Sequence, residues 1–455
     1  MSVQTLSGVL TESYVFDLGD TLVIEEGTRV DWAGPDTDPA LLSLENGESS
    51  GHLEIEVAGG LYAGAFAVYV YHATDTPSVH ITNSETGFIG GQRGITVHSD
   101  GADTQILNHG HIDATYGAMG GSGDQNHFAN SGLLTGGTGF ALGFAADLVQ
   151  GQTAINTGLI QSDNAFLAYR VEGLAIENTG TIQSDGVAFR LTYATTSSVS
   201  NSGHVDAGYG VLTYDSTQIV VFNSGVMICD HFAFLGDVNA TMAIHNTGDV
   251  HARVAVRGWS NSSFELHNSG QIFGDIDGGE DLPGFTNVAD RVVNSGLIDG
   301  QIRLSSGDDV YRGLGDGVTT GRVDGGSGQD RISGAALEDQ LYGGAGMDVL
   351  RGRQGEDTLR GGDEDDRIRG GRDADTLSGG VGNDLFLFGQ ASGVDLIEDF
   401  TVGADRIQIA GHAGGFETLE IADMGGDLVL MHAGGDIRLT GLAGTVLTDE
   451  DVVLI

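Results

Sequence analysis

The chain contains no lysine: all nineteen of its cations are arginine, against 64 acidic residues, for a net charge of -45. This excess of negative charge argues against nucleic acids and anionic membranes as electrostatic partners. The single cysteine, Cys229, excludes an internal disulfide, and we expect its thiol to be buried. No run of eighteen apolar residues exists, so no membrane-spanning helix is expected. The first twenty residues lack the basic start and apolar run of an N-terminal signal peptide.

Glycine is abundant, with 76 residues, and the hydrophobic content of 40% is too high for a disordered chain. Between residues 325 and 387 one nine-residue phrase repeats seven times, most clearly as GGSGQDRIS, GGAGMDVLR and GGVGNDLFL. The sixth position is always aspartate: Asp330, Asp339, Asp348, Asp357, Asp366, Asp375 and Asp384. Two places later an apolar residue follows each aspartate: Ile332, Leu341, Leu350, Leu359, Ile368, Leu377 and Phe386. Such unbroken register argues against a flexible glycine-rich linker.

The first six residues of the phrase predict a turn, because glycine adopts positive φ without steric strain. Backbone carbonyls and a carboxylate in one turn are hard oxygen ligands, which suit Ca²⁺. The last three residues predict a short strand with one inward apolar side chain. Two phrases then close one coil of roughly 18 residues, and stacked coils form a parallel β-roll. Alternate phrases share a side of the roll, so Asp330 is expected to lie beside Asp348, and Asp348 beside Asp366.

The predicted calcium ligands are the aspartates and the glycines of these turns. They are Gly325, Gly326, Gly328, Asp330, Asp339, Gly343, Gly344, Gly346, Asp348, Gly352, Gly355, Asp357, Gly361, Gly362, Asp366, Gly370, Gly371, Asp375, Gly379, Gly380, Gly382 and Asp384. Two departures weaken particular turns: the second phrase has Ala335 and Leu337 in place of glycine, and the fifth and sixth have Glu364 and Asp373.

The phrase resembles that of the RTX (repeats-in-toxin) family of exported calcium-binding proteins, also called hemolysin-type calcium-binding repeats. The resemblance is close over residues 325–387 and looser over 306–313 and 395–409. It implies Ca²⁺ as the cofactor, and export from a Gram-negative cell by the type I secretion apparatus through an uncleaved C-terminal signal. The ending TDEDVVLI, acidic and then apolar, resembles such a signal. A secreted, extracellular or cell-surface location is therefore expected.

A second, longer period precedes the nonapeptides. Asn-x-Gly recurs at intervals of 22, 26, 22, 23, 22, 23, 22 and 26 residues, at Asn108, Asn130, Asn156, Asn178, Asn201, Asn223, Asn246, Asn268 and Asn294. Apolar residues lie two places before each asparagine and two places after each glycine. Short strands separated by turns at this period predict a right-handed parallel β-helix, in which each asparagine amide bonds to the asparagine one coil away. An α-helical alternative is excluded, because the apolar residues lie two positions apart, as in a strand, and lack the three- and four-residue spacing of a helix.

The chain is thus expected to be all-β: a right-handed parallel β-helix, then a calcium-binding parallel β-roll, then a C-terminal β cap. We divide it into an N-terminal cap with the first coils (1–80), the β-helix (81–304), the RTX β-roll (305–390) and a capping and secretion segment (391–455). Residues 53–59 and 67–71 are predicted strands, and 278–286 a loop. Residues 395–400 and 425–442 are predicted to form hairpin-like strands that close the C-terminal end.

The β-helix fold is common among polysaccharide lyases, hydrolases and epimerases, so catalytic groups could lie along the predicted coils. The motif YG-x-D-P-H of an epimerase family that joins a β-helix to RTX modules is absent. An outward column of carboxylates with nearby tyrosines and arginines fits a sugar groove, but a solvated acidic face with packed tyrosines is favoured, because no nucleophile–base pair is found among these residues. These residues are Asp163, Asp185, Asp230, Asp275, Tyr169, Tyr193, Tyr214, Arg170 and Arg190. His109, His111 and His127 have no ligand spacing for a metal.

No catalytic residue is therefore assigned. The leading hypothesis is a secreted, nonenzymatic calcium-binding protein whose β-roll folds on extracellular Ca²⁺ and whose β-helix contacts a surface, a matrix or a carbohydrate. The alternative is a secreted polysaccharide lyase or C5-epimerase acting on the β-helix. Calcium ions, the type I secretion apparatus and an extracellular polysaccharide or cell surface are the expected partners; nucleic acid and a transmembrane segment are not.

Overall fold

The computed structural model describes residues 3–10, 14–16, 21–24, 29–32, 41–44, 53–72, 78–99, 104–143, 148–259, 261–279 and 288–455. Within these ranges every regular element is a strand, apart from one short 3-10 helix, η1 (Phe416–Thr418). No helix in the described part of the chain has the length and apolar character needed to cross a membrane. The chain divides into two units: Met1–Ala243 with Gly248–Ala252, and Ile244–Thr247 with Arg253–Ile455. The division falls within β26 (Thr241–Asn246) and β27 (Asp249–Gly258).

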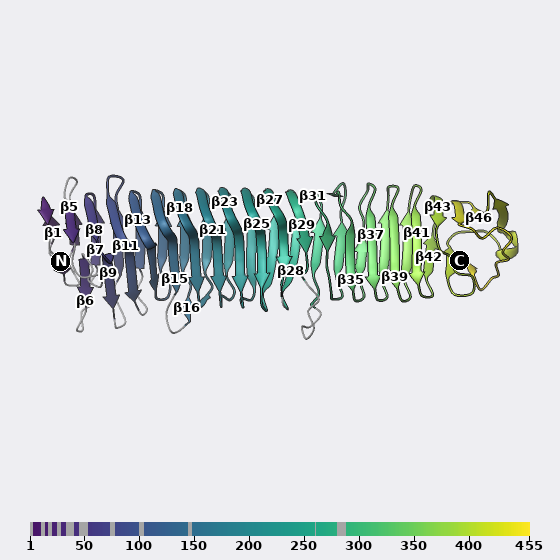
Figure 1. Cartoon of the computed structure of the whole chain (residues 1–455), viewed down its shortest axis with the longest axis horizontal. Helices are drawn as coiled ribbons and strands as arrows, with labels where there is room; N and C mark the ends of the chain where they lie inside the picture. Colours follow the sequence, from purple (N-terminus) through teal and green to yellow (C-terminus); the bar gives the residue numbers. More distant parts are fainter. Residues whose placement is uncertain are drawn as a thin grey trace. The chain divides into compact units, whose positions relative to one another are not determined.

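The first unit is a parallel β-solenoid in which each coil adds a strand to two columns (Figure 1). Its first column contains β1 (Val3–Leu6), β4 (Thr21–Ile24), β7 (Leu53–Val57), β10 (Val79–Asn83), β12 (Thr104–Asn108), β14 (His127–Asn130), β17 (Thr153–Asn156), β20 (Ala175–Asn178), β22 (Ser198–Asn201) and β24 (Ile219–Asn223), all paired in parallel.

Its second column contains β2 (Val9–Leu10), β3 (Tyr14–Phe16), β5 (Arg29–Trp32), β6 (Leu41–Leu44), β8 (Gly60–Ala63), β9 (Phe66–His72), β11 (Phe88–Ser99), β13 (His111–Ser122), β15 (Leu133–Gly143), β18 (Leu159–Tyr169), β21 (Thr181–Thr192), β23 (His204–Tyr214) and β25 (Val226–Asp237). A short parallel pair, β16 (Val149–Gln150) and β19 (Val171–Glu172), lies beside them. The described strands of the first 44 residues thus pair in the same parallel manner as later coils.

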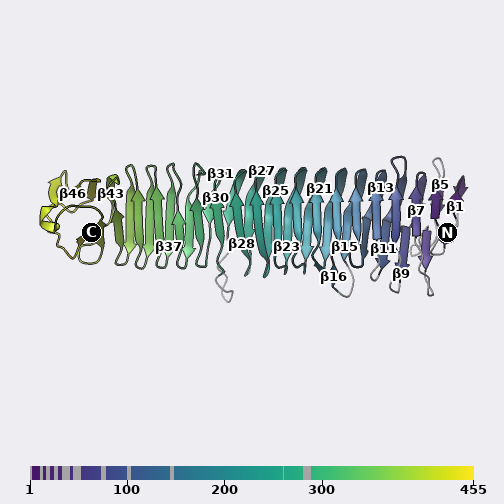
Figure 2. The ribbon, with the colours of Figure 1, turned by 180° about the vertical axis from the view of Figure 1, so that it is seen from behind.

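The second unit continues the parallel pattern with shorter strands. One column holds β28 (Ser263–Asn268), β30 (Arg291–Asn294), β33 (Val310–Gly313), β36 (Arg331–Ser333), β38 (Val349–Arg353), β40 (Arg367–Gly371), β42 (Leu385–Phe388), β44 (Arg406–Ile409) and β48 (Val452–Leu454). The other holds β29 (Gln271–Asp277), β31 (Leu297–Asp299), β32 (Ile302–Arg303), β34 (Val318–Thr319), β35 (Val323–Ser327), β37 (Gln340–Ala345), β39 (Thr358–Asp363), β41 (Thr376–Val381), β43 (Gly393–Ile397) and β47 (Gly435–Leu439). Figure 2 shows these strands from behind.

The C-terminal segment changes to antiparallel pairing. β45 (Glu420–Met424) pairs with β46 (Asp427–His432), and β46 pairs with β47. The prediction of hairpin-like strands over 425–442 is therefore confirmed. For residues 395–400 it is wrong, because β43 pairs in parallel with both β41 and β47, as a coil strand does. The predicted secretion signal contributes β48, which pairs in parallel with β44.

The core follows the apolar positions of both periods. Ile106, Ile112, Leu350 and Phe386, and the residues at the corresponding positions of the other coils, are at most 1% exposed. Strand assignments at 53–59 and 67–71 are confirmed by β7 and β9, and Cys229 is buried as predicted. Burial raises the pKa of its thiol to about 12. The predicted loop at 278–286 lies outside the described residues, apart from Gly278 and Gly279.

The repeated asparagines form a buried amide ladder, as predicted. In the first unit the Nδ2 group of each donates to Oδ1 of the next at 2.7–2.8 Å, from Asn83 through Asn108, Asn130, Asn156, Asn178 and Asn201 to Asn223. In the second unit the ladder runs from Asn246 through Asn268 to Asn294, where the amide donates to the carbonyl of Val318. These buried amides require partners, so the ladder holds consecutive coils in register.

Candidate metal centre

The seven aspartates of the nonapeptide phrases are buried, with between 0 and 5% of each residue exposed. They form two stacks through hydrogen bonds in which the backbone N–H of one donates to Oδ1 of the aspartate one coil further on. One stack runs Asp330, Asp348, Asp366, Asp384 and the other Asp339, Asp357, Asp375, with N···O distances of 2.8–2.9 Å. The predicted side-by-side placement of Asp330, Asp348 and Asp366 is therefore observed.

The second carboxylate oxygen of most of these aspartates has no partner. Among the described residues, Oδ2 is buried without a hydrogen bond in Asp330, Asp348, Asp357, Asp366, Asp375 and Asp384. Burial is the main reason that the pKa of Asp357 and of Asp366 rises to about 8, and that of Asp348 and Asp375 to about 7. The backbone N–H bond to each carboxylate acts in the opposite direction but does not offset burial. A buried anionic oxygen without a donor requires a cation or a proton.

The first glycine of every phrase makes room for this oxygen. A Cβ on Gly325 would overlap Oδ2 of Asp330, and the same overlap with the aspartate five residues on occurs at Gly334, Gly343, Gly352, Gly361, Gly370 and Gly379. The same Cβ position on Gly325 lies 2.7 Å from the carbonyl oxygen of Gly343. At Gly325, Gly334, Gly343, Gly352 and Gly361 this space is bordered by a carboxylate oxygen and by a backbone carbonyl of the next coil, and at Gly370 and Gly379 by the carboxylate.

The remaining predicted glycines shape the turn rather than border the carboxylate. Gly326, Gly344, Gly362, Gly371 and Gly380, at the second position, all have positive φ. So do Gly328, Gly346 and Gly355 at the fourth position, whereas Gly382 does not. Glu364 (φ 79°) and Asp373 (φ 74°) adopt the left-handed backbone of the glycines they replace, as does Arg353 (φ 89°). These substitutions keep the turn but introduce local backbone strain.

The second phrase, with Ala335 and Leu337, has a different turn. The backbone N–H of Ala335 donates to Oδ2 of Asp339 at 2.7 Å, so the oxygen that is free in the other turns has a protein donor here. Neither Ala335 nor Leu337 has the positive φ found in the other turns. A nearby Arg353 also lowers the pKa of Asp339, although burial still raises it overall. Of the seven aspartates, Asp339 is therefore the least suited to ligate a cation.

The geometry of the turns fits calcium through its oxygen donors. Within the described residues no three side chains of His, Cys, Asp or Glu converge on one point. A cation beside an aspartate Oδ2 must therefore complete its shell with backbone carbonyls, which is a donor set that Ca²⁺ accepts and Zn²⁺ does not favour. The three histidines considered as metal ligands each bond to a hydroxyl group instead. His109, His111 and His127 bond to Ser131, Thr135 and Thr153, respectively, at 2.5–2.8 Å.

The two aspartate stacks extend beyond the nonapeptides. Asp290 and Asp309 precede the first stack, Asp405 follows it, and Asp395 follows the second, through the same N–H to Oδ1 bonds of 2.6–3.0 Å. Oδ2 of Asp395 is buried without a hydrogen bond, whereas Oδ2 of Asp405 accepts the N–H of Thr401 at 2.7 Å. Asp309, Asp395 and Asp405 lie in the looser stretches of the resemblance, but none of the four was predicted as a ligand, because their spacing is 19 to 21 residues instead of 18. Like the nonapeptide aspartates, each of these four is followed two places later by an apolar or aromatic residue, and this sequence feature could have identified them.

The first unit places the tyrosines that were considered for a sugar groove against one another. Tyr169 and Tyr193 meet edge to face at 5.4 Å, and Tyr193 and Tyr214 at 5.9 Å. Asp163, Asp185 and Asp230 are exposed, and Asp275 is partly exposed and paired with Arg303 at 3.4 Å. These tyrosines thus pack against one another, while Tyr193 remains 39% exposed.

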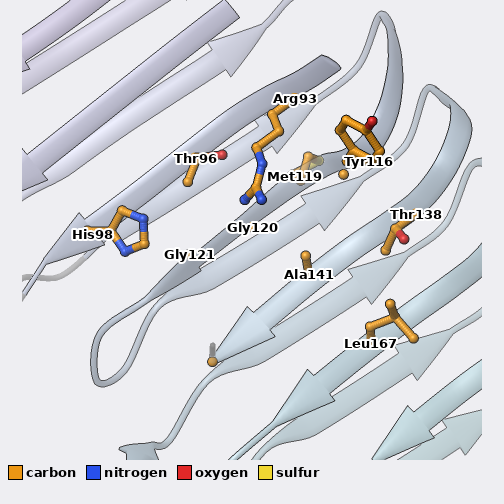
Figure 3. A pocket seen from close by; sticks show the side chains of 12 residues that line it. Arg93, Thr96, His98, Tyr116, Met119, Gly120, Gly121, Thr138, Ala141 and Leu167 are labelled. Atoms are coloured by element: carbon orange, nitrogen blue, oxygen red, sulfur yellow. The ribbon is translucent and has the colours of Figure 1, made fainter. Parts of the chain in front are cut away.

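A hollow of about 340 Å³ lies on the second strand column of the first unit. Figure 3 shows Arg93 and His98 on one strand and Tyr116 and Met119 on the next, with Ala141 and Leu167 on the strands that follow. Tyr116 is 62% exposed, and none of the described residues that line the hollow is a carboxylate. His98 is bonded to Ser122 at 2.7 Å.

Comparison with known proteins identifies one family. The model of the RTX calcium-binding nonapeptide repeat, in four copies, matches residues 324–359 and 351–386. No curated protein matches the chain. Among the solved structures that match is the solution structure of the AlgE6R3 subunit from the Azotobacter vinelandii mannuronan C5-epimerase. It has 26% identity over 28% of this chain and 80% of that chain, with a TM-score of 0.17.

Proposed function

From the RTX calcium-binding repeats at residues 324–386, whose metal is Ca²⁺, we propose a secreted protein whose nonapeptide coils fold when extracellular calcium binds. One observation carries the proposal: six stacked aspartates have a buried Oδ2 with no donor among the described residues. We assign Asp330, Asp348, Asp357, Asp366, Asp375 and Asp384 as the carboxylate ligands. Carbonyls of the glycine turns supply further oxygens, and the first glycines provide the space. No catalytic step is part of the proposal.

Without the metal, the stacked carboxylates oppose folding. Each must leave water as an anion or take up a proton, and each lies next to carboxylates of neighbouring coils, which raise the pKa of Asp366 further. Bound Ca²⁺ supplies the positive charge that compensates this desolvation. Its binding free energy then becomes folding free energy for the coils that hold it. A chain made in low calcium stays unfolded in this segment, as passage through a type I secretion apparatus requires.

The first unit has a different source of stability and is proposed to supply the contact surface. Its coils are held by buried apolar residues and by the asparagine ladder, neither of which needs a metal. The hollow with exposed Tyr116 and Arg93 supports contact with a surface, a matrix or a carbohydrate, because an exposed ring and a guanidinium suit sugar faces and acidic groups.

Hydrogen exchange of the full chain, read by mass spectrometry with calcium or with chelator, tests this function. We expect strands β38–β42 to lose protection in chelator, because their turns then contain uncompensated buried carboxylates, while β17–β24 stay protected. The β17–β24 peptides serve as the internal control. Equal protection of β38–β42 in chelator and in calcium would show that calcium does not drive folding.

A further inference from the structure

A face of the second unit is rich in arginine although the chain is strongly acidic. The outward side chains at the positions that pair across β33, β36, β38 and β40 are Val310, Arg312, Arg331, Ser333, Val349, Arg351, Arg367 and Arg369. Five of these eight are arginine and none is acidic, against a net charge of -45 for the chain. We call these eight residues the arginine face. All five arginines are exposed, whereas Tyr311, Ile332, Leu350 and Ile368 between them are buried.

The strand register arranges these arginines in two rows. Parallel pairing places Arg312, Ser333, Arg351 and Arg369 side by side in one row. It places Val310, Arg331, Val349 and Arg367 in the other. Because paired strands lie about 4.8 Å apart, the guanidinium-bearing positions Arg331 and Arg367 are separated by roughly 10 Å along the stack. The face thus presents positive charge at regular intervals perpendicular to the strands.

The arginines of this face are not used in ion pairs. Among the described residues, no salt bridge includes any of the five. Two arginines on the other side of the second unit differ: Arg322, directly before β35, pairs with Asp324 at 2.6 Å, and Arg360 in β39 pairs with Glu398 at 3.6 Å. The guanidinium groups of the face are therefore available to an external anion.

The face is hollowed and continues toward the turns. One hollow of about 490 Å³ is lined by Arg312, Arg331, Arg351, Arg353 and Arg367. A second of about 490 Å³ shares Arg351 and Arg353 and adds Arg369, Arg372 and Gln390. Arg353 is held in place by donating to the carbonyl of Gly313 at 3.0 Å. The two hollows together make an elongated arginine-lined surface across several coils.

We propose that the arginine face binds an acidic polysaccharide, an extended chain that carries a carboxylate on its sugar rings. A guanidinium fork donates two parallel hydrogen bonds to a carboxylate, and repeated arginines match repeated carboxylates. Val310 and Val349 alternate with the arginines of one row and suit the apolar face of a sugar ring. Nucleic acid fits less well, because none of the eight outward residues is an aromatic on which a base could stack. The inference rests on the proposed function, since the face is complete only when these coils are folded.

Titration calorimetry of the full chain in saturating calcium tests the proposal, with an oligogalacturonate long enough to span four strands as the probe. We expect binding that weakens with added salt and that falls about tenfold or more in the variant Arg351→Gln/Arg367→Gln/Arg369→Gln. The matched control is Arg322→Gln/Arg360→Gln on the other side of the second unit, which should change affinity by less than about twofold. The methyl-esterified oligomer, which lacks the charges, should not bind.

Several outcomes would overturn the proposal. Unchanged affinity in the triple variant would mean that calcium bridges the sugar to protein carboxylates. Equal affinity for the methyl ester would show that binding does not depend on the carboxylate charges. Tighter binding of single-stranded DNA of equal charge would show that the face prefers nucleic acid to an acidic polysaccharide. Hydrogen exchange separates this inference from the proposed function. If a variant loses sugar binding while β38–β42 stay protected in calcium, the coils are still folded and the result bears only on the arginine face. If the triple variant loses that protection, Arg351→Gln and Arg369→Gln are each measured singly.

Discussion

The nonapeptide aspartate performs two tasks with its two oxygens. Oδ1 accepts a backbone N–H from the neighbouring coil, and Oδ2 lies buried beside a glycine that has no Cβ to fill the space. The first glycine and the aspartate are therefore required together. Asp339 differs because the backbone N–H of Ala335 donates to its Oδ2, so this oxygen is not free to ligate a cation.

This difference predicts unequal effects of the same substitution in one stack. Asp357→Asn removes a proposed ligand and should weaken calcium binding by about tenfold or more, whereas Asp339→Asn should have a much smaller effect. Calcium titrations followed by circular dichroism measure both. Asp363→Asn, which removes one charge from an exposed position, controls for the change in net charge. Equal losses for Asp339→Asn and Asp357→Asn would contradict the assignment.

At the scale of the element, each coil of the first unit is joined to the next by strand pairing and by one buried asparagine. Asn178 donates to Asn201 and accepts from Asn156, both at 2.8 Å, and is fully buried. Gln161 and Gln183 form a similar amide pair at 2.7 Å on the outside of the same coils. Burial distinguishes the two ladders, because only the inner one lacks water as an alternative partner.

Asn178→Ala should therefore lower the free energy of unfolding by about 2–4 kcal/mol, since it removes two buried hydrogen bonds. Gln161→Ala, which breaks a comparable bond in solvent, should lower it by less than about 0.5 kcal/mol. Urea unfolding in saturating calcium compares the two variants. A ladder that only fills space would give Asn178→Ala and Gln161→Ala similar values.

For the molecule as a whole, the dominant quantity is the net charge of -45. Calcium reduces the repulsion in the second unit, but without calcium only dissolved salt can screen it. The screening length falls from roughly 10 Å at 0.1 M to roughly 3 Å at 1 M ionic strength. The proposed effect of this acidity, which is to oppose folding of the nonapeptide segment in low calcium, should therefore depend on ionic strength.

We expect sodium chloride to raise the urea midpoint of the chain in chelator, because screening relieves repulsion among carboxylates. In saturating calcium the rise should be smaller, since bound cations already compensate the stacked aspartates. Circular dichroism at several salt concentrations gives both midpoints, and sucrose at equal osmolality controls for general exclusion effects. A chelator midpoint that is insensitive to salt would contradict a role for net charge.

Much of the fold could be predicted because both repeats are local patterns with a constant period. The spacing of Asn178 and Asn201 predicted stacked amides, and the spacing of Asp348 and Asp366 predicted their adjacency, and both hydrogen bonds are observed. The continuation of the stack to Asp395 was harder to find, because the coil there is longer than 18 residues. The pairing of residues 393–397 could not be read from their own sequence, since their partners in β47 lie about forty residues further along the chain.

The sequence by itself determined the all-β coiled architecture, the calcium-binding repeats and the buried apolar positions, because each depends on a short period that every coil repeats. Only the tertiary structure decided which aspartate oxygen is free, which turn is blocked by Ala335, and which arginines share a face. These properties depend on backbone conformation within single turns and on the register between coils. Arg331, Arg351 and Arg369 are far apart in the chain and become neighbours only through parallel strand pairing.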